Sequence, residues 1–242
     1  MYGLLLPPMP PAFKPYKAAD LVNLPRVDPG LLLAQRTRQR MNRLRCSGTT
    51  GTWTECMFNN GADYSAFNTS ASEGSLLAGV NDQPVVPALF FFNKQGKQRG
   101  LSLLARGILG TTSTPTIIFQ WRLGTTLGSS YLSGTSVGVS VAITTASGIS
   151  NQWWESRLDL TCYTAGLGSG NTTLTANGYV SSPGAFASPF QYALEPTTPP
   201  TATWTATIDA SVTYYVNLSV TWSASSASNT ATLKQLQMLG LN

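Results

Sequence analysis

Short runs of alternating apolar and polar residues fill the chain from about residue 76 to its C-terminus. In residues 157–164, for example, Leu158, Leu160 and Cys162 alternate with Asp159 and Tyr163. A period of two puts successive side chains on opposite faces of a β-strand. The pattern predicts strands at residues 85–93, 100–109, 115–123, 136–144, 155–164, 172–181, 201–209, 213–223 and 230–239, with one more near 52–58.

Glycine, proline, asparagine and serine separate these runs, and no helical period follows residue 75. Eight or nine short strands at this spacing indicate an all-β fold. We therefore predict an antiparallel β-sandwich, most simply a jelly roll, over residues 76–242. Residues 46–75 are rich in Gly, Thr, Ser and Asn and are predicted to be a loop-rich connection.

Residues 1–45 have a different pattern, with seven prolines among the first 29 residues. Proline fixes φ and removes a hydrogen-bond donor, so an extended arm without a core of its own is expected. Asp28 and Pro29 provide an N-cap and a first-turn proline for a short Arg-rich helix over residues 29–44. The arm carries apolar residues and arginines that we expect to contact a partner: Leu4, Leu6, Phe13, Tyr16, Leu21, Arg36, Arg38, Arg40, Arg43 and Arg45.

The charge is concentrated in this arm. Residues 1–45 hold eight Lys/Arg and two Asp, a net charge of +6, which leaves −1 for the rest of a chain whose total is +5. The arginine cluster at residues 36–45 could bind nucleic acid, dock on an acidic protein surface, or form a solvated helix face. Docking is favoured, because the nearly neutral remainder offers no second basic patch to extend a nucleic-acid footprint.

The composition argues against catalysis. The chain has no histidine and only ten acidic residues, whereas 44 of its last 143 residues are Ser or Thr. A serine or cysteine nucleophile would therefore lack its usual base, and no motif surrounds Lys94, Lys97 or Lys234. Glu155 and Asp159 would lie roughly 13 Å apart on one strand face, beyond the spacing of a glycosidase pair. We expect no enzyme activity, no cofactor and no metal.

Other features have simple structural readings. Cys46, Cys56 and Cys162 lack metal-binding spacing and are expected to be free, buried thiols. The glycine-rich segment 166–170 is expected to connect two strands. The pairs Trp153–Trp154 and Tyr214–Tyr215 could stack on sugars, but adjacent strand residues point to opposite faces. The N-terminus lacks the apolar run of a signal peptide or membrane span.

Five segments resemble a domain of virion structural proteins from tailed bacteriophages. They read RGILGTTSTPT (106–116), WRLGTT (121–126), ITTASGISN (143–151), RLDLTCYTAG (157–166) and LSVTWSASSASNTATLKQL (218–236). The resemblance covers roughly residues 76–242 and implies a β-sandwich on a phage particle. It does not extend to the arm.

These observations together predict a non-enzymatic virion protein. Our first interpretation is a capsid decoration or cement protein that docks by its arm and oligomerises through its sandwich. Its partners would be other virion proteins, above all the major capsid protein, and further copies of itself, without nucleic acid or membrane. The alternatives are a tail, baseplate or fibre component, a carbohydrate-binding module for host-surface sugars, or a secreted Ser/Thr-rich β protein.

Overall fold

The computed structural model describes residues 46–47, 53–61, 64–77, 83–92, 99–127, 131–188, 191–197 and 204–241. The chain from Met41 to Asn242 forms one compact unit. The arm at residues 1–45, its helix and all ten of its partner-contact residues lie outside the described residues. The division of the chain near residues 45 and 75 stays a prediction.

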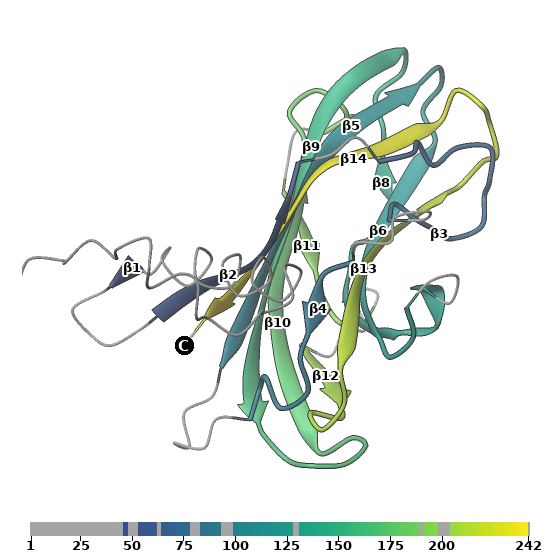
Figure 1. Cartoon of the computed structure of the whole chain (residues 1–242). Helices are drawn as coiled ribbons and strands as arrows, with labels where there is room; N and C mark the ends of the chain where they lie inside the picture. The colour runs from purple at the N-terminus through teal and green to yellow at the C-terminus, as the bar shows by residue number, and fades with distance from the viewer. Residues whose placement is uncertain are drawn as a thin grey trace, which may run out of the picture. The chain divides into compact units, whose positions relative to one another are not determined.

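Two antiparallel sheets make up this unit (Figure 1). The eight-stranded sheet has the order β1-β2-β14-β5-β9-β10-β11, and β12 also pairs with β10. Its strands are β1 (Cys46–Ser47), β2 (Trp53–Asn60), β5 (Gly100–Thr111), β9 (Ile149–Thr164), β10 (Thr172–Ser181), β11 (Tyr192–Leu194), β12 (Thr205–Ile208) and β14 (Thr230–Leu241).

The six-stranded sheet has the order β3-β13-β6-β7, with β4 on β13 and β8 on β6. Its strands are β3 (Gly74–Ser75), β4 (Val85–Val86), β6 (Thr116–Gly124), β7 (Thr135–Val139), β8 (Ile143–Thr144) and β13 (Tyr214–Trp222). Among the described residues, the single 3-10 turn at Tyr131–Ser133 is the one helical segment.

The chain crosses repeatedly between the two layers. β5 and β6 are consecutive but lie in opposite sheets, and so do β13 and β14. The segment 223–229 is thus an arch between sheets rather than a hairpin loop. This arrangement confirms the predicted all-β antiparallel sandwich.

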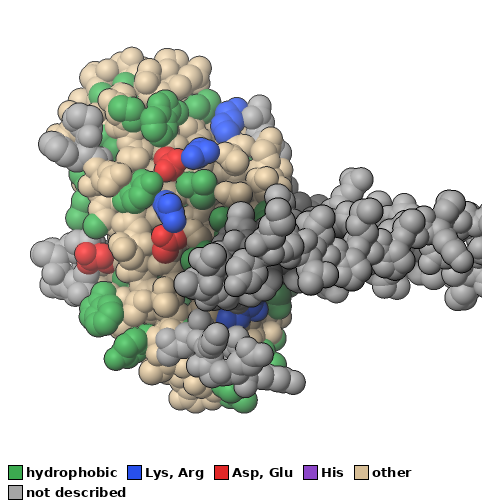
Figure 2. Space-filling model, turned by 90° about the vertical axis from the view of Figure 1, so that its left-hand side faces the viewer, with side chains coloured by type: hydrophobic (Ala, Val, Ile, Leu, Met, Phe, Trp, Pro, Cys, Tyr) green, Lys and Arg blue, Asp and Glu red, His purple; other side chains and the backbone are tan. Residues whose placement is uncertain are grey.

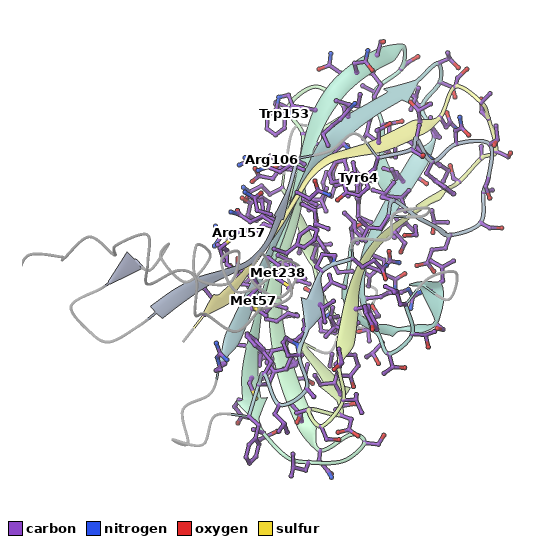
Figure 3. All side chains as sticks on the ribbon, in the orientation of Figure 1. Met57, Tyr64, Arg106, Trp153, Arg157 and Met238 are labelled. Carbon is purple, nitrogen blue, oxygen red and sulfur yellow. The ribbon has the colours of Figure 1, made fainter. Side chains whose placement is uncertain are left out.

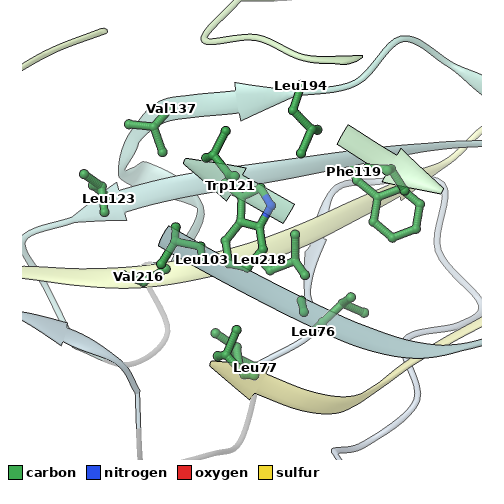
Figure 4. Close-up of a cluster of buried hydrophobic side chains, with 14 of the residues drawn as sticks. Leu76, Leu77, Leu103, Phe119, Trp121, Leu123, Val137, Leu194, Val216 and Leu218 are labelled. Atoms are coloured by element: carbon green, nitrogen blue, oxygen red, sulfur yellow. The ribbon is translucent and has the colours of Figure 1, made fainter. Parts of the chain in front are cut away.

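The core lies between the sheets and is centred on large aromatic side chains (Figure 4). Trp121 of β6 is fully buried, and its indole Nε1–H donates to the hydroxyl of Ser156 on β9 over 2.9 Å. Phe119 packs on Trp154 across the layers, with ring centroids 4.9 Å apart. A Cβ at Gly107 would lie 2.6 Å from the Trp154 ring, so glycine provides the space for this indole.

The structure differs from the predicted strands in several places. In the described part of the predicted strand at 85–93, which ends at Phe92, only Val85–Val86 is a strand, because Pro87 begins a turn in which Leu89 adopts a φ of 63°. Phe90 and Phe91 still enter the core from this turn. The predicted strand at 136–144 is interrupted, since the hydroxyl of Ser140 accepts the N–H of Phe119.

Two strand starts were also misplaced, and a short strand was missed. β9 begins at Ile149 rather than at Glu155, and β12 begins at Thr205 rather than at residue 201. The short strand β11 was not predicted at all. A three-residue strand carries too few positions for a period of two to be recognised.

Candidate binding surface on the eight-stranded sheet

The outer face of the eight-stranded sheet carries the most varied surface chemistry in the described structure. Along β9 the inward residues Trp154, Leu158 and Leu160 are fully buried, whereas the neighbouring Trp153 and Arg157 are exposed. Figure 3 shows Trp153, Arg106 and Arg157 on the side of this sheet that faces away from the other layer. From Trp154 to Tyr163, the alternation of β9 therefore displays every second residue on one outward face.

Four charged side chains form the centre of this face, and we call them the charged ladder: Arg106, Glu155, Arg157 and Asp159. The register places Arg106 of β5 opposite Glu155 of β9, and their Nε and Oε2 atoms are 2.7 Å apart. Arg157 lies between the two acids, and its Nη2 is 3.2 Å from an oxygen of Asp159. Figure 2 shows these opposite charges side by side in the middle of the face.

Neutral side chains complete the ladder. The hydroxyl of Tyr179 donates to Glu155 over 2.9 Å, and this hydrogen bond raises the pKa of Tyr179 above its ordinary value. The hydroxyl of Ser102 donates to Asp159. A depression of about 220 Å³ lies beside the ladder and is lined by Ser102, Leu104, Arg106, Glu155, Arg157, Gln237 and Leu239. Each carboxylate is thus held by an arginine and a hydroxyl, an arrangement that presents fixed hydrogen-bonding groups to a flat partner.

A second part of the same face is aromatic. Tyr163 at the end of β9 and Trp204 just before β12 are 58% and 63% exposed, and their ring centroids are 6.2 Å apart. Exposed large aromatic side chains are frequent at binding surfaces. The sequence placed Tyr163 on the outer face but could not reveal Trp204 beside it, because β10 brings the two segments together.

A separate pocket of about 330 Å³ lies among the loops that follow β9 and β12. It is lined mainly by threonine, serine and glycine, together with Asp209 and Tyr214. Hydrogen bonds from Ser211 hold the pKa of Asp209 below its ordinary value. A single carboxylate gives this pocket little capacity for a cation, and no group of three metal-ligating side chains occurs among the residues described.

The structure shows the burial or the location of several residues that the sequence analysis considered as site candidates. Trp154 and Tyr214 are buried while Trp153 is exposed and Tyr215 half-buried, as the alternation predicted. Residues 166–170 connect β9 to β10, which confirms a strand connection. Cys162 is a buried free thiol, and Cys56 is free but only half-buried. Lys94, Lys97 and the side chain of Cys46 lie outside the described residues.

The two carboxylates that were considered as a glycosidase pair both lie on β9. Glu155 and Asp159 lie on one face of β9 with Arg157 between them, as expected. Lys234 lies on β14, and its side chain is not free of interactions there. No helix within the described part of the chain is both long and apolar enough to span a bilayer.

Comparisons with known proteins give distant structural likenesses but no match in sequence. No family model matches the chain, and no curated protein matches it. Among the solved structures that match is the CBM2 module of the evolved Dit of Lactobacillus casei BL23 phage J-1. The two chains are 13% identical over 81% of this chain and 92% of that one, with a TM-score of 0.28. A likeness of this size carries no argument about what this chain does.

Proposed function

We propose that this protein is a non-enzymatic structural component of a tailed-phage particle. The β-sandwich found here is the fold that the resemblance of residues 76–242 implies. The observation that carries the proposal is the outer face of the eight-stranded sheet, where the arginines of the charged ladder are about half exposed and are paired with the ladder's own carboxylates. Such a face suits docking against a broad protein surface better than enclosing a small substrate.

The non-enzymatic part of the proposal rests on how the acidic groups are used. Glu155 accepts hydrogen bonds from Arg106 and Tyr179, and Asp159 accepts one from Ser102. A general acid or base needs a carboxyl group that can exchange a proton with a substrate. Both carboxylates of the ladder are instead engaged with neighbouring side chains.

Two positions on a particle are compatible with this role. In the first, the protein is a capsid decoration or cement protein, whose arm at residues 1–45 docks on the major capsid protein and whose sandwich contacts further copies. Attachment through several weak contacts on a repeating lattice would give high avidity without a deep pocket. In the second, it is a tail, baseplate or fibre component, where the same face would contact neighbouring subunits.

The copy number per particle distinguishes these positions. Quantitative mass spectrometry of purified particles, scaled to the major capsid protein, would measure it. A head-lattice protein should be present in the order of hundreds of copies and a tail component in about six to a few dozen, since both follow the symmetry of their host structure. Absence of the chain from purified particles would contradict the proposal as a whole.

A further inference from the structure

One end of the outer face of the eight-stranded sheet is built from hydroxyl-bearing and aromatic residues. We call it the threonine–aromatic platform. Strand pairing aligns Thr161 with Thr175 and Thr175 with Thr205, and a second row aligns Thr164, Thr173 and Thr207. The platform comprises these six threonines together with Tyr163 and Trp204.

The alternation of the three strands places the platform on the outside. Between its members, Cys162 of β9, Leu174 of β10 and Ala206 of β12 are buried in the core. The platform threonines are half-buried or exposed. The hydroxyls are therefore displayed on the surface in register from strand to strand.

A β-bulge sets the position of Tyr163. Leu174 pairs with Cys162, whereas Thr173 pairs with Thr164, so Tyr163 is the extra residue. A bulge adds a residue to one strand and re-aims its side chains. Here both Tyr163 and Thr164 are exposed.

Trp204 is positioned from the other side of β10. Its carbonyl accepts the N–H of Ala176 over 3.2 Å, which ties the backbone of Trp204 to the edge of β10. The Tyr163 and Trp204 rings then lie at an interplanar angle of 60°. The edge of one ring therefore approaches the other ring.

Trp204 is exposed, as is Trp153 at 51%, whereas three other indoles of the sandwich are buried. Trp121, Trp154 and Trp222 are at most 1% exposed, whereas Trp204 is 63% exposed. Leaving a large aromatic side chain in water forgoes the gain from burying it. An occupied binding surface would recover that gain.

The chemistry of the platform is that of a sugar-binding surface. None of its eight residues carries a charge. A threonine hydroxyl both donates and accepts hydrogen bonds, as sugar hydroxyls do. The C–H face of a pyranose is apolar and stacks on an aromatic ring. We propose that the threonine–aromatic platform binds a neutral glycan, with a sugar ring stacked on Trp204, flanked by Tyr163 and hydrogen-bonded to the threonines.

Charged ligands fit this place less well. Single-stranded nucleic acid also stacks on aromatic rings, but it needs a basic groove along its backbone. Asp159, one outward position along β9 from Thr161, is already bound by Ser102 and Arg157. Arg99 lies with its guanidinium 4.3 Å from the centre of the Phe90 ring.

Affinity electrophoresis of the purified full chain tests the inference. The probes are amylopectin, hydroxyethylcellulose and galactomannan as neutral polysaccharides, with polygalacturonate as the charged comparison. We expect at least one neutral gel to retard the protein. Trp204→Ala and Tyr163→Ala should each raise the dissociation constant for the retarding polysaccharide about tenfold or more.

Two further variants make the result specific. Trp153→Ala removes an aromatic residue of similar exposure at the other end of β9, and it should bind like the unmodified protein. Thr175→Val removes a platform hydroxyl with little change of shape and should weaken binding. Thermal melting should show that all four variants remain folded, since surface substitutions usually change stability by within about 0.5 kcal/mol.

Three results would overturn the inference. They are no retardation by any neutral gel, equal or stronger retardation by polygalacturonate, and binding that is insensitive to Trp204→Ala and Tyr163→Ala. The inference goes beyond the proposed virion role and does not depend on it. The assay uses no particles, so its failure would leave the copy-number result untouched, and the reverse also holds.

Discussion

The buried tryptophans differ in whether their indole N–H has a hydrogen-bond partner. The indole N–H of Trp121 donates to Ser156, whereas those of Trp154 and Trp222 have no hydrogen-bond partner among the described residues. The Trp121–Ser156 bond joins β6 of one sheet to β9 of the other. A buried donor without a partner costs free energy, so this one hydroxyl contributes to holding the layers together.

We predict that Ser156→Ala lowers the free energy of unfolding by about 1–3 kcal/mol, because it leaves the Trp121 indole N–H unpaired. Urea unfolding measures the change as a lower midpoint. Ser150→Ala, at an exposed position on the same strand, should leave the midpoint unchanged. A double-mutant cycle with Trp121→Phe should show coupling, and purely additive effects would contradict the role given to this hydrogen bond.

A second interaction acts at the scale of whole elements. The carboxylate of Glu73, just before β3, binds two guanidinium nitrogens of Arg122 on β6, each over 2.8 Å. Ser219 of β13 donates to the same carboxylate, and Ser75 donates to Asn217 over 2.5 Å. This cluster fastens the segment before β3 across the outer face of β6 and β13. It explains why Asn217 and Ser219 are buried although they point away from the core.

This cluster should make stability depend on pH. Burial alone would raise the pKa of Glu73, but hydrogen bonds from Arg122 and Ser219 outweigh it and hold the pKa below its ordinary value. A depressed pKa in the folded state adds stability above the unfolded pKa of about 4.3, and the gain is lost as pH falls through the folded pKa.

We predict that Glu73→Gln lowers the free energy of unfolding at pH 7 by about 1.5–3 kcal/mol. The difference from the unmodified protein should shrink as the pH falls below the unfolded pKa of about 4.3 and through the lower pKa of folded Glu73, because Glu73 then loses its charge. Urea titrations between pH 7 and pH 3 measure this. Glu155→Gln is the matched control, since its partner Arg106 is 51% exposed and exposed pairs contribute little. A difference that is constant with pH would exclude the ionic contribution.

At the scale of the molecule, strand pairing shows which parts the sandwich needs. β2 pairs with β14 along most of its length, for example Cys56 with Leu239. Met57 and Phe58 of β2 pack against the buried core. The segment that contains β2 is therefore joined to the sheet. The docking role of the arm at residues 1–45 stays a prediction.

We predict that deleting residues 1–40 leaves the circular dichroism spectrum and melting temperature unchanged, because the compact unit begins at Met41. The shortened protein should fail to co-sediment with particles that lack the full-length chain. Deletion of residues 1–60 is the contrasting variant, and it should lower the melting temperature because it also removes β2. Full occupancy of particles by the first variant would show that residues 1–40 play no part in attachment.

The strands themselves were largely predictable from the sequence, because a period of two is a local property. Leu158, Leu160 and Cys162 needed no partner to be placed inward, nor did Val216, Leu218 and Val220 of β13. The outward placement of Glu155, Arg157 and Asp159 followed from the same alternation. Only their pairing with Arg106 and Ser102 required the register between β5 and β9.

The remaining features depend on contacts between residues far apart in the chain. Phe90 and Phe91 are buried without a strand because Pro87 and Leu89 turn the chain toward the core. Asn217 and Ser219 are buried because Glu73 and Ser75 cover them. Trp204 meets Tyr163 because β12 pairs with β10 beside a bulge. Alternation along the sequence therefore determined which face of the sheet each strand residue lies on. Which residues it contacts on that face was decided by strand register and loop packing. Both of these form only when distant parts of the chain pack around a common core.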